Sequence, residues 1–294
     1  MIEGVPTWLS HAIILAGLFY ASYTDLKTRE VPDILNYSLM ALGVILAGTA
    51  SILQETFLPV LHSILGLLGG YLLGALMFYT GQWGGGDAKM LMAVGAFHGI
   101  SISQLLAGEF PLFFTTFVSF MLAGALYGLI YALVLMLRRF KTVMAEVSKF
   151  HSQGQAAMAR NIVLGVGVVG LVVALLIQAQ IISIFIGLVT TFLVVGYYLL
   201  ILGRVVEKTC MIQTVPLNKV TVGDWIVEDI HIRGKRVCGP KDLGISEKQL
   251  GELKKHKVKA VKVKYGIPFI PGFLLGYALI LIFGNWIVQL LTLL

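Results

Sequence analysis

Apolar segments long enough to cross a lipid bilayer recur along most of this chain, and they constrain its fold more than any other feature. Hydrophobic residues make up 57% of the 294 residues and charged residues only 13%, whereas an ordinary soluble domain is about 25% charged. A spanning helix needs about 17–25 mostly apolar residues and satisfies its backbone hydrogen bonds internally. The sequence therefore predicts an all-α polytopic membrane protein.

Eight spans are predicted along the chain. The fourth is the weakest, because it contains Gly, Ser, His and Gln side chains that suit the inside of a helix bundle better than a lipid-facing position. The expected spans are residues 8–24, 34–53, 58–80, 88–106, 110–137, 162–178, 181–202 and 268–293.

The distribution of Lys and Arg orients these spans. All 22 lysines and arginines lie in, or at the edge of, alternate connections, and the intervening connections carry none. Positively charged loops stay in the cytoplasm. We therefore expect a multi-pass protein of the cell membrane, with both termini outside.

Five parts follow from this arrangement: membrane helices at 1–137, a basic cytoplasmic loop at 138–161, two further helices at 162–203, a small cytoplasmic α/β module at 204–266 and a final membrane helix at 267–294. The loop suits an amphipathic surface helix and a solvated segment equally well.

Within the module, β-branched alternation predicts strands in 220–232 and 258–263, and Ser246 is expected to cap a short helix. Its positive charge suits anionic membrane lipids. Contact with a substrate's charges, or the positive-inside rule alone, explains that charge equally well.

Two acidic residues lie at the ends of apolar runs, both on the predicted cytoplasmic side. Asp25 ends the first span, and Asp87 directly follows the run Gly84-Gly85-Gly86. Carboxylates near a hydrocarbon core are costly and mark functional sites by default. A single aspartate at a span boundary is as often a solvated interfacial residue, but two on one face predict a pair.

Two neighbouring carboxyl groups can share one proton and hydrolyse a peptide bond. The ionised group takes a proton from water, and the protonated group donates to the scissile carbonyl. The glycines at 84–86 permit positive φ and the close approach of an extended substrate strand. Lys89 and Asp33 are expected to shape the site, Asp33 as a third acid near the pair.

Helix dipoles suggest which aspartate holds the proton. Asp25 is expected at the C-terminal end of a helix, where ionisation is disfavoured, and Asp87 at the N-terminal end of another, where it is favoured. We therefore expect Asp87 to act mainly as the base and Asp25 mainly as the proton donor.

No cofactor, metal ion or nucleic acid is expected. Cys210 and Cys238 form no CxxC pair, so they predict neither a zinc site nor a disulfide framework. We interpret both as inert thiols in a reducing compartment. The sequence contains no zinc-protease, nucleophile-elbow or phosphate-loop motif.

The segments DLKTREVPD (residues 25–33) and GGGDAKML (residues 84–91) resemble the two signature segments of type IV prepilin peptidases. This family of GxGD membrane aspartyl proteases includes the archaeal preflagellin peptidases. The resemblance implies that Asp25 and Asp87 are catalytic and that prepilin- or preflagellin-like proteins are substrates. It is clearest over residues 10–135 and extends weakly to 266–275.

Departures from the family pattern are also informative. Bacterial members carry a cytoplasmic domain with two CxxC pairs after the first helix, associated with N-methylation, and this chain has only a short loop there. Methyltransferase activity is therefore not expected. Asp33 stands where bacterial relatives usually have Asn, and spans six and seven fit the compact archaeal pattern poorly.

Two alternatives remain at this stage. A GxGD protease of presenilin or signal-peptide-peptidase type would carry a Pro-Ala-Leu motif near its C-terminus, and Pro268-Phe-Ile-Pro271 is not one. An ion-coupled transporter would place its acids near mid-membrane, whereas both aspartates are predicted at the boundary. The sequence predicts no oligomeric state.

Overall fold

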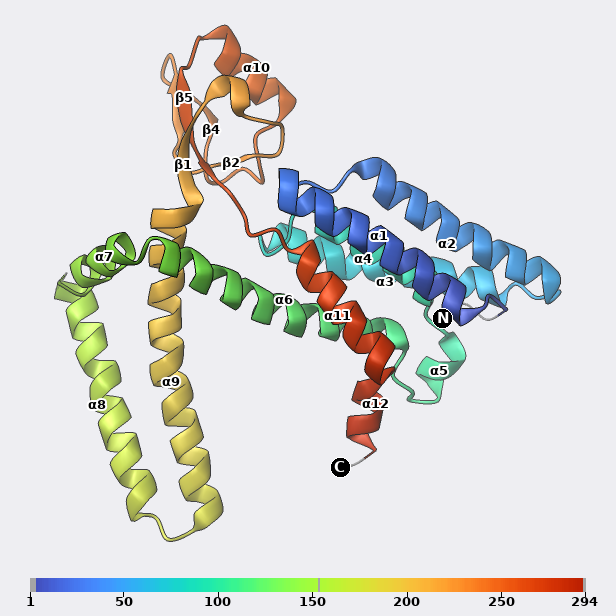
Figure 1. The fold of residues 1–294 in the computed structure, drawn as a ribbon, viewed down its shortest axis with the longest axis horizontal. Coiled ribbons are helices and arrows are strands. Elements are labelled where there is room, and N and C mark those ends of the chain that lie inside the picture. The colour runs from blue at the N-terminus through green and yellow to red at the C-terminus, as the bar shows by residue number, and fades with distance from the viewer. Residues whose placement is uncertain (1–3, 153, 293–294) are drawn as a thin grey trace. The chain divides into compact units, whose positions relative to one another are not determined.

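The computed structural model describes residues 4–152 and 154–292. The chain divides into two compact units (Figure 1): the first runs to Ile130 and resumes at Gly266, and the second is Tyr131–Tyr265. The α-helices are α1 (Thr7–Thr28), α2 (Asp33–Leu53), α3 (Leu58–Tyr79), α4 (Gly85–His98), α5 (Ile102–Leu106), α6 (Leu112–Arg138), α7 (Phe140–Ser152), α8 (Gly154–Leu176), α9 (Gln180–Val206), α10 (Glu247–Lys255), α11 (Ile270–Phe283) and α12 (Trp286–Leu291).

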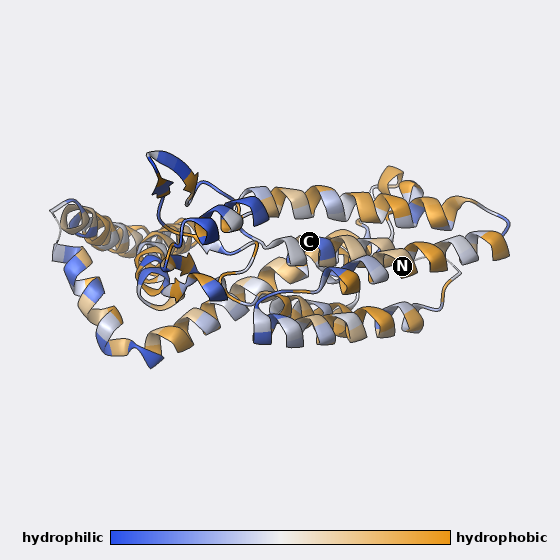
Figure 2. Cartoon of the chain, turned by 90° about the horizontal axis from the view of Figure 1, so that it is seen from above, coloured by the Kyte–Doolittle hydropathy of each residue, from blue (hydrophilic) through white to orange (hydrophobic). Residues whose placement is uncertain are grey.

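The predicted all-α membrane fold is confirmed. Among the described residues, α2, α3, α6, α8 and α9 are long and apolar enough to cross a membrane, by length and composition. Figure 2 shows long helices in which orange, hydrophobic residues predominate. The other three predicted spans correspond to α1, α4 and α11, of which α4 and α11 have only 14 residues each.

Two predicted spans are not continuous helices. The segment 88–106 breaks after His98, where Gly99 has a φ of +66°, and helix resumes only in the short α5. The segment 268–293 breaks after Phe283, at Gly284 with a φ of +59°. Glycine adopts positive φ without steric cost and commonly ends helices, a signal that hydropathy does not report.

Glycines bring α3 and α4 into direct backbone contact. Gly66, Gly70 and Gly74 are four residues apart on one face of α3. A Cβ at Gly66 would overlap the carbonyl oxygen of Gly95, and one at Gly70 would lie 2.7 Å from the Cα of Met92. Such small-residue spacing lets membrane helices approach closely, so α4 is held tightly along α3.

Close contacts at glycines also join α11 to α6 within the first unit. A Cβ at Gly272 would lie 2.7 Å from the Cα of Gly124, and one at Gly276 would lie 2.7 Å from the carbonyl oxygen of Ser119. The buried core around these contacts is mainly aromatic and aliphatic, and includes Leu18, Met90, Leu91, Val94, Phe97, Phe113, Phe120, Phe273 and Tyr277.

In the second unit, the basic loop contains a helix. Of the two interpretations left open, the helical one holds, because α7 covers Phe140–Ser152 and packs through Val143 against Val205 and neighbours on α9. Gly167 and Gly170 of α8 face Val194 and Thr190 of α9, so α8 and α9 form a hairpin.

The module that follows α9 is a small α/β structure with its own core. A three-stranded antiparallel sheet has the order β1-β5-β2, and β3 pairs with β4. Arg233 and Gly234 both have positive φ in the two-residue turn between β3 and β4, as type I′ hairpin turns require. The strands are β1 (Ile212–Pro216), β2 (Trp225–Ile226), β3 (Ile230–Ile232), β4 (Lys235–Cys238) and β5 (Ala260–Lys264).

Capping and ion pairs organise the rest of the module. Ser246 caps α10 as predicted: its Oγ accepts from the Gln249 N–H, and the Gln249 Oε1 accepts from the Ser246 N–H. Arg236 binds Asp229 at 2.6 Å and Asp242 at 3.0 Å. The hydrogen bond from Arg236 holds the pKa of the Asp229 carboxyl below its ordinary value.

The α3–α4 contact generates a stability prediction. We expect Gly70→Ala to lower the free energy of unfolding by about 1–3 kcal/mol, because the new methyl group would overpack against the α4 backbone. Equilibrium unfolding in detergent micelles measures this. Gly48→Ala in α2 is the matched control, since nothing lies within 4 Å of a Cβ there. Equal stability of the two variants would contradict the close contact.

Candidate active site

The connection between α1 and α2 places Asp25 at the end of a helix. Arg29 follows with a φ of 60° and donates its backbone N–H to the Asp25 carbonyl oxygen at 2.8 Å, which closes the last turn. Pro32 then precedes the first residue of α2, and a residue before proline is restricted to extended conformations. This short connection returns the chain beside α1.

The Asp25 carboxylate is buried, with 6% of the residue exposed, and it binds the start of α11. Its Oδ2 accepts the backbone N–H of Ile270, the first residue of that helix, at 3.0 Å. Beside it, the Arg29 Nη1 donates to the Gly266 carbonyl oxygen at 2.6 Å. The end of α1 is therefore joined to the start of α11 by two hydrogen bonds.

Asp87 lies in the first turn of α4 and stabilises the start of that helix. Its Oδ2 accepts the backbone N–H of Gly84, the N-cap residue, at 2.9 Å. Acidic side chains are favoured at this position, because they bind N–H groups that have no partner within the helix. The residue is partly buried.

The two aspartates are brought together by elements far apart in sequence. The Asp25 carboxylate binds the first residue of α11, and Trp83, in the loop before Asp87, packs on Phe273 of the same helix. The two aspartates lie where the C-terminal end of α1 meets the N-terminal ends of α4 and α11. A shared-proton pair requires two carboxyl groups in one place, and this grouping of helix ends is compatible with that requirement.

The reason for assigning the proton to Asp25 does not hold. That expectation considered only the dipole of the helix that carries each aspartate. In the structure the Asp25 carboxylate lies at the N-terminus of α11, where a helix dipole stabilises negative charge. Both carboxylates thus accept an N–H at a helix N-terminus, and the dipole argument no longer distinguishes them.

The positive φ expected at the three glycines before Asp87 is not found. None of them is among the positive-φ residues of the described chain, and the positive φ of this loop falls at Gly81. A Cβ at Gly86 would lie 3.0 Å from the Cβ of Val31. At Gly84 it would meet only the Asp87 Oδ2, at 3.4 Å, so the loop is open there.

Asp33 and Lys89 form an ion pair beside the aspartates. The Lys89 Nζ lies 2.6 Å from the Asp33 Oδ1, and the Asp33 side chain is 60% exposed. Lys89 also lies over the ring of Tyr37, 5.2 Å from its centre. The third acid is therefore neutralised by its own partner and links the start of α2 to α4.

Three contributors to the site were not predicted. Trp83 is buried and packs edge-on against Phe273, which anchors the loop before Asp87. Asn36 is fully buried and donates its Nδ2 to the Gly86 carbonyl oxygen at 3.3 Å. The sequence signal for Asn36 was a polar side chain within an apolar span. The Ile270 N–H has no sequence signal, because every residue except proline carries one.

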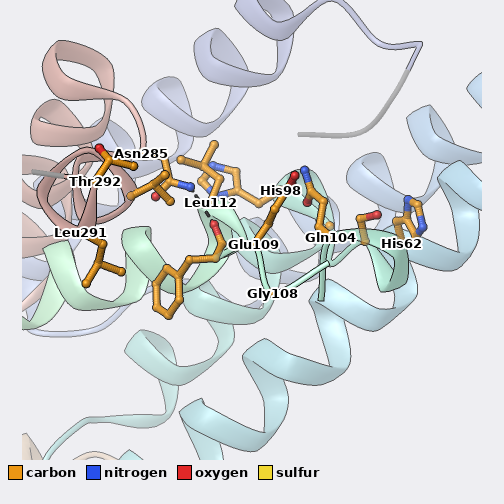
Figure 3. Close-up of a pocket in the computed structure, with 13 residues that line it drawn as sticks. His62, His98, Gln104, Gly108, Glu109, Leu112, Asn285, Leu291 and Thr292 are labelled. Atoms are coloured by element: carbon orange, nitrogen blue, oxygen red, sulfur yellow. Dashed lines mark hydrogen bonds between the residues drawn. The ribbon is translucent and has the colours of Figure 1, made fainter. Parts of the chain in front are cut away.

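A separate cavity of about 510 Å³ lies at the other end of α4 (Figure 3). His98, which lines it, is eleven residues from Asp87, or about 16 Å along a helix. Glu109 is the only acid among its described lining residues. Within the described ranges no group of three or more His, Cys, Asp or Glu could hold a metal ion. The cavity therefore offers no second acid pair.

Part of the chain is similar to a known protein family. Residues 12–133 match the type IV leader peptidase family. This segment contains Asp25, Asp87 and both motifs, so the resemblance drawn from those motifs is confirmed over it.

The similar curated proteins are archaeal. The chain is 36% identical over 88 residues to the preflagellin peptidase of Methanococcus voltae, which covers 30% of this chain and 37% of the relative. It is 41% identical over 80 residues to the preflagellin peptidase of Methanocaldococcus jannaschii. That segment covers 27% of this chain and 34% of the relative. It is 32% identical over 94 residues to the prepilin peptidase EppA of Methanothermobacter thermautotrophicus. That segment covers 32% of this chain and 24% of the relative. The similarity spans about a third or less of these relatives' lengths.

Proposed function

We propose that the protein is a membrane aspartyl endopeptidase that removes the short basic leader from prepilin- or preflagellin-like precursors. The observation that supports this proposal is that Asp25 and the loop before Asp87 both contact the start of α11, with each carboxylate accepting a backbone N–H at a helix N-terminus. The names of the relatives, preflagellin peptidase and prepilin peptidase, support the same substrate class.

The reaction follows from a carboxyl pair that shares one proton. The ionised carboxylate takes a proton from water as its oxygen adds to the scissile carbonyl, and the protonated carboxyl donates its proton to the carbonyl oxygen. Return of a proton to the peptide nitrogen then breaks the C–N bond. The backbone N–H groups of Gly84 and Ile270 hold the two carboxylates in place throughout.

The open face of the glycine loop suits the approach of an extended substrate. Gly84 is exposed, and any side chain there would project toward the Asp87 carboxylate. Gly85 is similarly open, with only a Phe78 carbon near a Cβ, at 3.9 Å. We therefore assign Gly84 and Gly85 to substrate approach, and Gly86 with the Lys89–Asp33 pair to shaping of the loop.

The location follows from the charge distribution. We place the pair near the cytoplasmic face of the cell membrane, with both termini outside, because every Lys and Arg then lies inside. A precursor's leader lies in the cytoplasm directly before its apolar helix, so the same face presents the scissile bond. Membrane lipids surround the apolar helices.

Loss of either aspartate is expected to abolish cleavage. In Asp25→Asn and Asp87→Asn, one of the two proton-transfer groups is missing, so processing should fall by about a hundredfold or more. The measurement uses purified protein and a precursor with its leader intact, followed by gel mobility over time.

Asp33→Asn is the matched control for these variants. It makes the same chemical change nearby, in a side chain that is exposed and paired with Lys89, and should cost less than about tenfold because exposed ion pairs contribute little. Near-normal cleavage by either Asp25→Asn or Asp87→Asn, at equal amounts of folded protein, would refute the catalytic pair.

The rate of processing should depend on pH as a bell-shaped curve. At low pH both carboxyls are protonated and no base remains, whereas at high pH both are ionised and no proton donor remains. Single-turnover rates of the purified enzyme across pH measure both limbs. A rate that rises monotonically with pH would indicate a single base and exclude the shared proton.

Cysteine labelling tests the proposed orientation. In Ser246→Cys the new thiol should be protected from a membrane-impermeant reagent in intact cells, and in Thr292→Cys it should be labelled. The parent protein is the control, because Cys210 and Cys238 are both buried. Labelling of residue 246 from outside would overturn the assignment of the module to the cytoplasm.

A further inference from the structure

Buried polar atoms without a protein hydrogen-bond partner are rare in this structure. In the described chain there are four such side-chain atoms: Ser10 Oγ, Ser22 Oγ, Asn36 Oδ1 and His151 Nε2. Leaving a buried polar atom unpaired costs about 1–3 kcal/mol, so such atoms are usually satisfied by ordered water or serve a function. Two of the four are linked to the aspartates: Ser22 is three residues before Asp25 in α1, and Asn36 binds Gly86, the residue before Asp87.

Ser22 lies directly beside Asp25. The two residues are three positions apart in α1, so they occupy the same helix face, one turn from each other. Both are 6% exposed. The Ser22 hydroxyl is therefore a buried donor and acceptor next to one carboxylate.

Asn36 contacts the residue directly before Asp87. Its Nδ2 donates to the carbonyl oxygen of Gly86, the residue before Asp87, so the amide is fixed in orientation. The Oδ1 of the same amide is left as a buried acceptor. An amide bound at its nitrogen presents its oxygen in a defined direction.

The packing of α1 against α2 places Ser22 and Asn36 toward the same end of the helix pair. The short connection makes the helices antiparallel neighbours, and a Cβ at Gly17 would lie 2.6 Å from the Leu39 Cδ1. From that contact, Ser22 is five residues forward in α1 and Asn36 three residues back in α2. At about 1.5 Å per residue, these offsets are about 7.5 Å along α1 and about 4.5 Å along α2. Both point toward the helix ends where the aspartates lie.

We propose that Ser22 and Asn36 bind the water molecule that the aspartate pair activates. The water donates one hydrogen to the ionised carboxylate and the other to the Asn36 Oδ1, and it accepts the Ser22 hydroxyl hydrogen. Its remaining lone pair attacks the scissile carbonyl while the first hydrogen passes to the carboxylate. This assignment rests on the proposed peptidase function and adds two residues that neither motif contains.

The chain supplies a matched control for Ser22. Ser10 lies on the same helix, is 1% exposed, and has an equally unpartnered hydroxyl. It is fifteen residues from Asp25, or about 22 Å along the helix. Ser22→Ala and Ser10→Ala therefore remove the same hydroxyl group from a buried position on the same helix. Ser22→Ala does so near the aspartate pair, and Ser10→Ala does so far from it.

We expect Ser22→Ala to lower kcat by about tenfold or more, the effect of losing one hydrogen bond to a reacting group, and to leave KM unchanged. Ser10→Ala should leave both constants within about twofold, since no reacting group is near. Loss of water positioning slows the chemical step without weakening substrate binding. The assay is cleavage of a leader-bearing precursor by the purified full-length protein at several substrate concentrations.

Asn36→Leu tests the second residue with a similar side-chain volume. It should also lower kcat at unchanged KM. Ser63→Ala is its control, because it removes a comparable side-chain hydrogen bond, from Ser63 Oγ to the Ala96 carbonyl oxygen, at the far end of α4. Unfolding measurements on all four variants separate lost stability from lost chemistry.

The outcomes separate this inference from the proposed function. Equal kcat in Ser22→Ala and Ser10→Ala, or a raised KM with unchanged kcat, would overturn the water-binding assignment. Asp25→Asn is run in the same assay. If Asp25→Asn is inactive while Ser22→Ala is normal, only the inference fails; if Asp25→Asn is active, the catalytic pair itself fails.

Discussion

The backbone contact between α3 and α4 is the constraint on which the rest of the first unit depends. With three glycines on the facing side of α3, the two helices touch along their main chains, and main-chain atoms cannot change rotamer to relieve a displacement. The start of α4, and with it Asp87, is therefore held by a contact between main chains that cannot easily adjust. A catalytic pair needs this kind of support, because its geometry must be held closely.

The opposite carboxylate is held by a different means. Asp25 is buried, and a buried charge is costly unless it is hydrogen-bonded. Its donor is the first N–H of α11, a group that has no partner within its own helix. The same bond thus satisfies a buried carboxylate and a helix end. Hydrogen bonds to an ionised acceptor are roughly twice as strong as neutral ones, so this contact is well suited to fix α11 beside α1.

The sequence predicted those parts of the structure that depend on short local sequence patterns. The placement of Asp25 and Asp87 at helix ends, the apolar helices and the Ser246 cap fall in this class, because run length and capping signals lie within a few residues. The breaks at Gly99 and Gly284 were missed, since they depend on backbone conformation and not on hydropathy. The partner of Asp25 could not be predicted, because a backbone N–H has no side-chain signal and lies 245 residues away.

That long separation has a consequence for biosynthesis. The donor to Asp25 belongs to α11, which the ribosome makes only after the whole of Tyr131–Tyr265 has been completed. Until then a nascent chain that already contains both aspartates has one carboxylate without its helix-end partner. Under the proposed function, the aspartate pair is therefore completed late, and immature chains at the translocon would not yet cleave peptides.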